Sequence, residues 1–89
     1  MLPASLAAAC DAHRVVVLMR VGCHLCEEAE ATAAAVCAPG TWTTLDVDAD
    51  AELTSRYTDH VPVTFVDGEQ FALWTLDETR LRAVLADEA

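Results

Sequence analysis

A short apolar run that leads directly into a pair of cysteines constrains the fold of this chain more than any other feature. The run RVVVLM at residues 14–19 is continuous and β-branched, as in a strand that is buried on both faces of a sheet. After GCHLC, residues 24–37 place apolar side chains at helical spacing and contain no glycine or proline. The sequence APG at 38–40 ends this helix, because proline cannot continue its hydrogen bonds. The pattern predicts a strand–helix unit with the cysteines at its joint.

The rest of the chain also consists of predicted strands and helices. Residues 41–48 have the alternation of a second strand, and residues 50–57 have the pattern of a short helix. Residues 61–66 and 69–74 are two β-rich runs separated by Asp-Gly, which is a strong signal for a two-residue hairpin turn. A closing helix follows the hairpin. The predicted order is therefore β-α-β-α-β-β-α.

This order predicts one α/β domain over residues 1–89. The first two strands are joined by a helix and should be parallel, whereas the hairpin strands must be antiparallel. A four-stranded mixed sheet with helices on both faces follows, but chain order leaves the strand order open. Thr75 and Glu78 have capping-box spacing ahead of the closing helix. Residues 1–12 have neither a basic start nor a long apolar stretch, so we expect a short helical or irregular lead-in and not a signal peptide.

The charge of the chain excludes two classes of partner. The formal net charge is −10, with five arginines, no lysine and fifteen carboxylates. Nucleic acids and anionic membranes require clustered basic side chains, so neither is expected as a partner. The longest apolar run is far too short to cross a bilayer. The acidic surface predicts a soluble monomer and favours basic partners.

With no secretory signal, four cysteines in a reducing cytoplasm indicate redox or metal chemistry more than a disulfide framework.

The cysteine pair has the spacing that thiol–disulfide exchange requires. With Cys23 in the first turn of the helix, free backbone N–H groups and the positive helix end favour its thiolate, which is the nucleophilic form. Cys26 lies one turn further along on the same side and can attack a mixed disulfide on Cys23, releasing the reduced substrate. His24 could add positive charge beside the nucleophile or simply be exposed. Arg20 could draw anionic groups to the site or only solubilise the end of the strand.

Together these motifs resemble the glutaredoxin-like proteins of the thioredoxin superfamily, above all the small bacterial ones. The resemblance spans roughly residues 14–86 and rests on GCHLC, on DVDAD after the second strand, on VPV opening the third and on DG in the hairpin. It implies a thioredoxin-like fold, with a cis Val61–Pro62 bond that faces the cysteines. It also implies that the Val61 backbone pairs with an extended substrate segment.

The same resemblance implies a function. We expect a cytoplasmic, monomeric thiol–disulfide oxidoreductase that takes part in electron transport, with Cys23 as nucleophile and Cys26 as resolving cysteine. Val61, Pro62, His24 and Arg20 are the expected substrate-binding residues. The substrates would be protein or small-molecule disulfides. No cofactor is expected to remain bound, and either glutathione or thioredoxin reductase would supply the electrons.

Several residues depart from the pattern of glutathione-dependent glutaredoxins. Those proteins usually carry Cys-Pro-Tyr-Cys, where this chain has His24-Leu25 between the cysteines, and threonine before Val-Pro, where it has His60. They also grip glutathione with a glycine pair before the last helix, where this chain has WTLDE at 74–78. Asp77 could meet an ammonium group there, but capping the helix is the simpler role. The sequence therefore leaves glutathione dependence open.

Three other interpretations of the cysteines compete with catalysis. Cys10-x-x-His13 and Cys23-x-x-Cys26 have the composition of a zinc site, but a strand between the pairs would separate them by roughly 20 Å. An iron–sulfur cluster shared by two subunits is a further alternative. The third is a thioredoxin-like adaptor that binds partners without catalysis. No nucleophile elbow or phosphate-binding glycine loop supports a hydrolase or a kinase.

The remaining unusual residues are interpreted as packing residues. Cys10 and Cys37 are expected as small apolar residues in or near the core, and the sequence leaves their pairing open. Met19, Trp42 and Trp74 are candidates for the core or for a groove.

Overall fold

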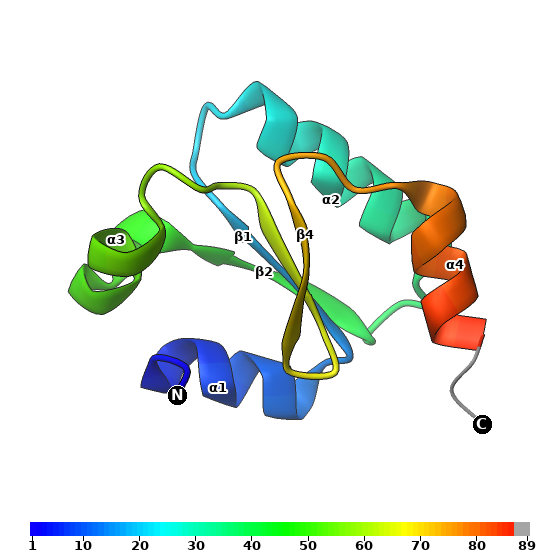
Figure 1. Cartoon of the computed structure of the whole chain (residues 1–89), viewed down its shortest axis with the longest axis horizontal. Helices are drawn as coiled ribbons and strands as arrows, with labels where there is room; N and C mark the ends of the chain where they lie inside the picture. Colours follow the sequence, from blue (N-terminus) through cyan, green and yellow to red (C-terminus); the bar gives the residue numbers. More distant parts are fainter. Residues whose placement is uncertain (87–89) are drawn as a thin grey trace.

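The computed structural model describes residues 1–86, which form a four-stranded mixed sheet with helices on both faces (Figure 1). Its elements in chain order are α1 (Ala4–Ala12), β1 (Val15–Met19), α2 (His24–Val36), β2 (Trp42–Asp46), the 3₁₀ helix η1 (Val47–Ala49), α3 (Ala51–Tyr57), β3 (Val63–Val66), β4 (Glu69–Leu73) and α4 (Glu78–Ala86). The expected order and architecture are confirmed. Within residues 1–86, no helix combines the length and the apolar character needed to cross a bilayer.

The strand order, which the sequence left open, is β2-β1-β3-β4. β1 is parallel to β2 and antiparallel to β3, so that Val16 lies beside Thr43 on one side and Phe65 on the other. β3 and β4 form the expected hairpin. Its turn residues Asp67 and Gly68 have φ values of 52° and 84°, and such positive values at both positions are typical of the Asp-Gly type I′ turn. β1 is therefore an inner strand, which explains its continuous apolar sequence.

The sheet separates two hydrophobic clusters. One lies on the face covered by α1 and α3, and contains Leu6, Val16, Leu18, Val47, Leu53, Val63 and Phe65. The other lies on the face covered by α2 and α4 (Figure 1), and contains Val15, Val17, Ala29, Ala33, Cys37, Val66 and Leu81. Residues 4–12, expected as part of a short lead-in, form a nine-residue helix whose Leu6 is fully buried. This segment therefore completes one of the two covering layers.

Phe65 is the largest of the buried side chains and belongs to the first cluster. Its side chain is 2% exposed. The ring of Tyr57, at the end of α3, meets it edge to face, with 6.1 Å between the ring centroids and 88° between the planes. This arrangement suits the charge distribution of aromatic rings. Phe65 therefore joins an inner strand to the helix that covers it.

The second strand ends earlier than its sequence pattern suggests. Val47, expected to continue the strand, lies in η1, although it is fully buried as the alternation predicts. The carboxylate of Asp46 accepts a hydrogen bond of 2.8 Å from the backbone N–H of Asp48. This local side-chain bond turns the chain out of the strand, because an Asx turn competes with the ladder for the same backbone group.

The cap of α4 also differs from expectation. Asp77, directly before the first helical residue, accepts a hydrogen bond of 3.0 Å from the backbone N–H of Arg80. The prediction of a capping box with Thr75 and Glu78 is therefore wrong. Asp77 caps the helix instead, which is the simpler role that the sequence suggested for it.

Asp50 links α1 to α3. Its carboxylate caps α3 by accepting from the N–H of Glu52 at 2.8 Å, and it also accepts from the Ser5 hydroxyl on α1 at 2.7 Å. The bond from Ser5, followed by that from the Glu52 N–H, lowers the pKa of Asp50 below its ordinary value of 3.8. The ionised carboxylate therefore stabilises the folded chain.

This linkage predicts a pH dependence that Asp50→Asn should diminish. A carboxyl with a depressed folded-state pKa stabilises the fold above its unfolded pKa, and that contribution is lost as pH falls through the folded value. The difference in urea midpoint between wild type and Asp50→Asn should be constant from pH 7 to about 5 and shrink below about pH 4. Asparagine can still cap the helix, so the comparison isolates the charge. A difference that stays constant down to pH 3 would contradict the assignment.

Candidate active site

The turn between β1 and α2 places Cys23 at the N-terminus of the helix. Gly22 has a φ of 82°, which favours glycine, and the N–H of Cys23 donates to the carbonyl of Arg20 at 3.2 Å to close the turn. Cys23 is the N-cap residue of α2, with an extended backbone at φ −90° and ψ 114°. Its sulfur accepts a hydrogen bond of 3.2 Å from the backbone N–H of Cys26. The sulfur thus occupies the position of a capping oxygen, where a negative charge is stabilised.

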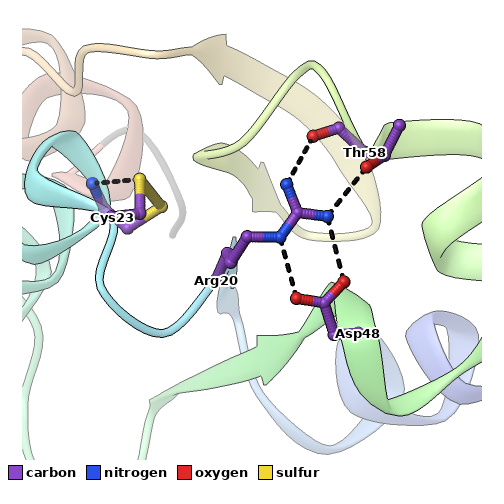
Figure 2. Close-up of a disulfide and its surroundings, with 5 residues drawn as sticks. Arg20, Cys23, Asp48 and Thr58 are labelled. Atoms are coloured by element: carbon purple, nitrogen blue, oxygen red, sulfur yellow. Dashed lines mark hydrogen bonds and ion pairs between the residues drawn. A yellow bond between two sulfur atoms is a disulfide. The ribbon is translucent and has the colours of Figure 1, made fainter.

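Cys23 and Cys26 form a disulfide, with 5.2 Å between their Cα atoms (Figure 2). The two residues differ in accessibility: Cys23 is half-buried, whereas Cys26 is fully buried on the inner face of α2. A partner in solution can therefore reach the sulfur of Cys23 more readily than that of Cys26.

Arg20 lies in the same turn, but its guanidinium points away from the disulfide (Figure 2). Nε and Nη2 donate to the two carboxylate oxygens of Asp48 at 2.8 and 3.0 Å. Nη1 and Nη2 also donate to the carbonyl and the hydroxyl of Thr58 at 3.0 and 2.8 Å. The bond from Arg20 holds the pKa of Asp48 below its ordinary value. Arg20 therefore links the active-site turn to η1 and to the C-terminal end of α3.

The other expected substrate-binding residues lie around the same end of the sheet. The His24 side chain is 89% exposed, and its Nε2 is 3.9 Å from the carboxylate of Glu28 one turn along. The Val61–Pro62 bond is cis. Val63, directly after Pro62, pairs with Leu18 near the end of β1, so Pro62 lies at the end of the sheet from which the chain continues to Cys23. Pro62 is buried and Val61 is half-buried.

Trp74, a candidate for the core or for a groove from the sequence, lies between β4 and α4 at this end of the sheet. Its backbone N–H donates to the carbonyl of Pro62 at 2.7 Å. Its side chain lines a crevice of about 90 Å³ together with Leu25, which stands between the two cysteines. The sequence signal that could have identified it is a tryptophan at the end of the second hairpin run, close to the cysteine end of the sheet.

The remaining cysteines lie in separate parts of the fold. Cys10 on α1 packs against the first cluster, and Cys37 after α2 belongs to the second, so the sheet stands between them and they do not pair. Burial raises the pKa of both thiols. β1 separates Cys10 and His13 from the cysteine pair, as expected. Among residues 1–86, no group of three histidine, cysteine or acidic side chains is placed to hold a metal ion.

Comparison with known proteins agrees with the fold and with the motif. The family model described as "Glutaredoxin-like domain (DUF836)" matches residues 14–86. An uncharacterised protein of Mycobacterium tuberculosis is 36% identical over 80 residues, which cover 82% of each chain. The crystal structure of the target protein XcR50 from X. campestris has a TM-score of 0.68 and 33% identity, covering 84% of this chain and 99% of that one. The holo form of glutaredoxin C1 from Populus tremula x tremuloides has a TM-score of 0.64 at 20% identity, covering 93% and 81%, and supports the fold alone. By its matched family model, its Cys-x-x-Cys pair and its thioredoxin-like fold, this chain belongs to the glutaredoxin-like (DUF836) family.

Proposed function

We propose that this protein is a thiol–disulfide oxidoreductase with Cys23 as nucleophile and Cys26 as resolving cysteine. The observation that carries the proposal is the unequal environment of two bonded sulfurs. Cys23 caps α2, where backbone N–H groups favour a thiolate, and it is partly accessible, whereas Cys26 is buried within bonding distance. An attacking sulfur needs access to substrate, and a resolving sulfur needs only access to its partner.

The proposed reaction consists of two exchanges. In the reduced protein, the Cys23 thiolate attacks one sulfur of a substrate disulfide. The substrate S–S bond breaks, a bond between Cys23 and the substrate forms, and one substrate thiolate leaves and takes a proton from water. Cys26 then gives up its proton and attacks the Cys23 sulfur. This step forms the Cys23–Cys26 disulfide and releases the second substrate thiolate. Two electrons pass to the substrate, and an external dithiol or two thiols must return them.

The surroundings of the pair suggest how the other residues act. Pro62 and Val61 lie at the end of the sheet where the active-site turn begins, and we assign their backbone to pairing with an extended substrate. His24 is exposed beside Cys23 and can contact a substrate directly. Arg20 acts as a positioning residue, because its bonds to Asp48 and Thr58 hold the turn before Cys23. In this proposal the protein works as a monomer in the cytoplasm, with glutathione or thioredoxin reductase as electron donor.

Thiol titration combined with a turnover assay tests the proposal. In denaturant, the dithiothreitol-reduced chain should titrate four thiols and the oxidised chain two, because the chain has four cysteines and one disulfide joins two of them. The native protein should catalyse reduction of hydroxyethyl disulfide with NADPH and either glutathione plus glutathione reductase or thioredoxin reductase. The faster donor system identifies the electron source. A disulfide that forms reversibly without turnover in either system would instead indicate a binding adaptor.

A further inference from the structure

Trp74 has a backbone conformation that a bulky side chain rarely adopts. Its φ is 64°, in the left-handed region where the β-carbon crowds the following carbonyl oxygen. The three glycines of the chain, Gly22, Gly40 and Gly68, all have positive φ, and Asp67 is of a type that tolerates it. Hydrogen bonds on both sides hold the turn: Trp74 N–H to Pro62 and Thr75 N–H to Leu73, both at 2.7 Å. A tryptophan therefore occupies a position for which glycine is best suited.

Burial does not explain this tryptophan. Trp74 is 50% exposed, so the fold recovers only part of the hydrophobic stabilisation that a buried tryptophan would give. Strained backbone that the packing does not compensate is typical of functional sites. The strain and the exposure together indicate that Trp74 serves a contact outside the chain.

Trp74 lies close to the segment that carries the cysteine pair, so the contact outside the chain would be made beside the disulfide. Trp74, Leu25 and Glu28 line the same crevice. The connection between β4 and α4, which contains Trp74, runs beside α2 (Figure 1). Leu25 separates the two cysteines in sequence, and Pro62, the partner of the Trp74 N–H, lies at the same end of the sheet. Among residues 1–86, the exposed large hydrophobic side chains other than Met1 all belong to segments at this end: Val21, Leu25, Leu73 and Trp74. The disulfide therefore has an apolar rim.

The charge around this rim is negative. Glu27 and Glu28 lie in the first turns of α2, and Glu28 lines the crevice itself. The cation in the active-site turn, Arg20, is already neutralised by Asp48. The whole chain carries a formal charge of −10. An anionic disulfide such as that of glutathione meets no free cation among these residues, whereas a basic segment with an apolar side chain meets complementary groups.

We propose that Trp74 is a specificity-determining residue that selects disulfides in basic protein segments, by receiving an apolar client side chain against Leu25 while Glu28 meets a client cation. The inference rests on the proposed oxidoreductase function and deepens it. Trp74 takes no part in the exchange of sulfurs, so it affects the choice of client and leaves the reaction of small disulfides unchanged.

The test compares peptide disulfides in the full-length protein. Two disulfide-linked peptide dimers of equal length carry leucine and lysine, or serine and glutamate, beside the cysteine, and hydroxyethyl disulfide serves as the small substrate. Wild type should show a kcat/KM at least about tenfold higher for the leucine–lysine peptide. Trp74→Gly and Trp74→Ala should lose most of this preference and keep the wild-type rate with hydroxyethyl disulfide. Glu28→Gln should remove only the part of the preference for the leucine–lysine peptide that added salt also removes, because salt screens the charge interaction. Equal kcat/KM for both peptides in wild type, or an unchanged preference in both Trp74 variants, would overturn the proposal.

Two controls separate recognition from structure. Trp74→Gly should unfold at a higher urea concentration than Trp74→Ala, because glycine relieves the left-handed strain. If both variants instead lost kcat/KM equally with every substrate, Trp74 would have a structural role. Binding can also be measured without chemistry. In a Trp42→Phe background, where Trp74 is the remaining indole, a leucine–lysine peptide with serine in place of cysteine should change the fluorescence. Binding without turnover of any disulfide would support the docking site and overturn the oxidoreductase function, whereas no fluorescence change would count against the docking site.

Discussion

Cys23→Ser is expected to abolish turnover of a model disulfide, lowering kcat/KM by at least ~10³-fold. A serine hydroxyl is not ionised near neutral pH and cannot form the mixed disulfide on which the second exchange depends. The substitution is mild for the fold, because serine is among the best N-cap residues and occupies the position where the Cys23 sulfur already accepts a backbone hydrogen bond. The loss should therefore be chemical, with circular dichroism and urea midpoint close to those of wild type.

Two further cysteine variants make this result specific. Cys26→Ser keeps the nucleophile, so it should still attack substrate but accumulate the mixed disulfide, which mass spectrometry detects as an adduct on Cys23. Cys37→Ser is the matched control: Cys37 is buried at the far end of α2, and its variant should turn over the substrate at the wild-type rate. Wild-type turnover by Cys23→Ser, or an adduct on a cysteine other than Cys23, would reject the assignment of the nucleophile.

Phe65→Ala is expected to cost about 3–5 kcal/mol in the free energy of unfolding. The substitution removes the largest buried side chain, leaves a cavity between β3 and α3, and deletes the edge-to-face contact with Tyr57. Small domains are stable by only about 5–15 kcal/mol, so most of the stability would be lost. Urea unfolding followed by circular dichroism measures the change.

Leu73→Ala provides the control for the Phe65 variant. Leu73 lies on the neighbouring strand of the same sheet, but its side chain is exposed, so the cost should be below about 1 kcal/mol. Similar losses for the two variants would show that the first cluster is not the main source of stability.

The sequence predicted the order of elements because each element carries a strong local signal. The run at 14–19, the helical spacing at 24–37 and the Asp-Gly turn depend on residues close together in the chain. Strand order does not depend on neighbouring residues, because it is set by which strands pair. One of the two strands that pair with β1 is β3, which lies far along the chain. Local signals can also compete: Thr75 and Asp77 are both able to cap α4, and only the path of the chain before the helix decides between them.

The same distinction applies to the site. The cysteine pair is a local motif and could be read directly from the sequence. The role of Arg20 could not, because its partners Asp48 and Thr58 lie 28 and 38 residues away. The left-handed backbone of Trp74 could not be predicted either, since the carbonyl of Pro62, directly before β3, helps to fix it. Contacts between distant segments thus determine which charged and aromatic side chains remain exposed at this end of the sheet.

The inner position of β1 has a consequence for the newborn chain. β1 leaves the ribosome before both of its neighbours, since it hydrogen-bonds on one side to β2 and on the other to β3, which is synthesised later still. Until Val63–Val66 has emerged, an apolar strand has an unpaired edge, and such edges invite association with other chains. The sheet can therefore be completed during translation only after β3 has been made.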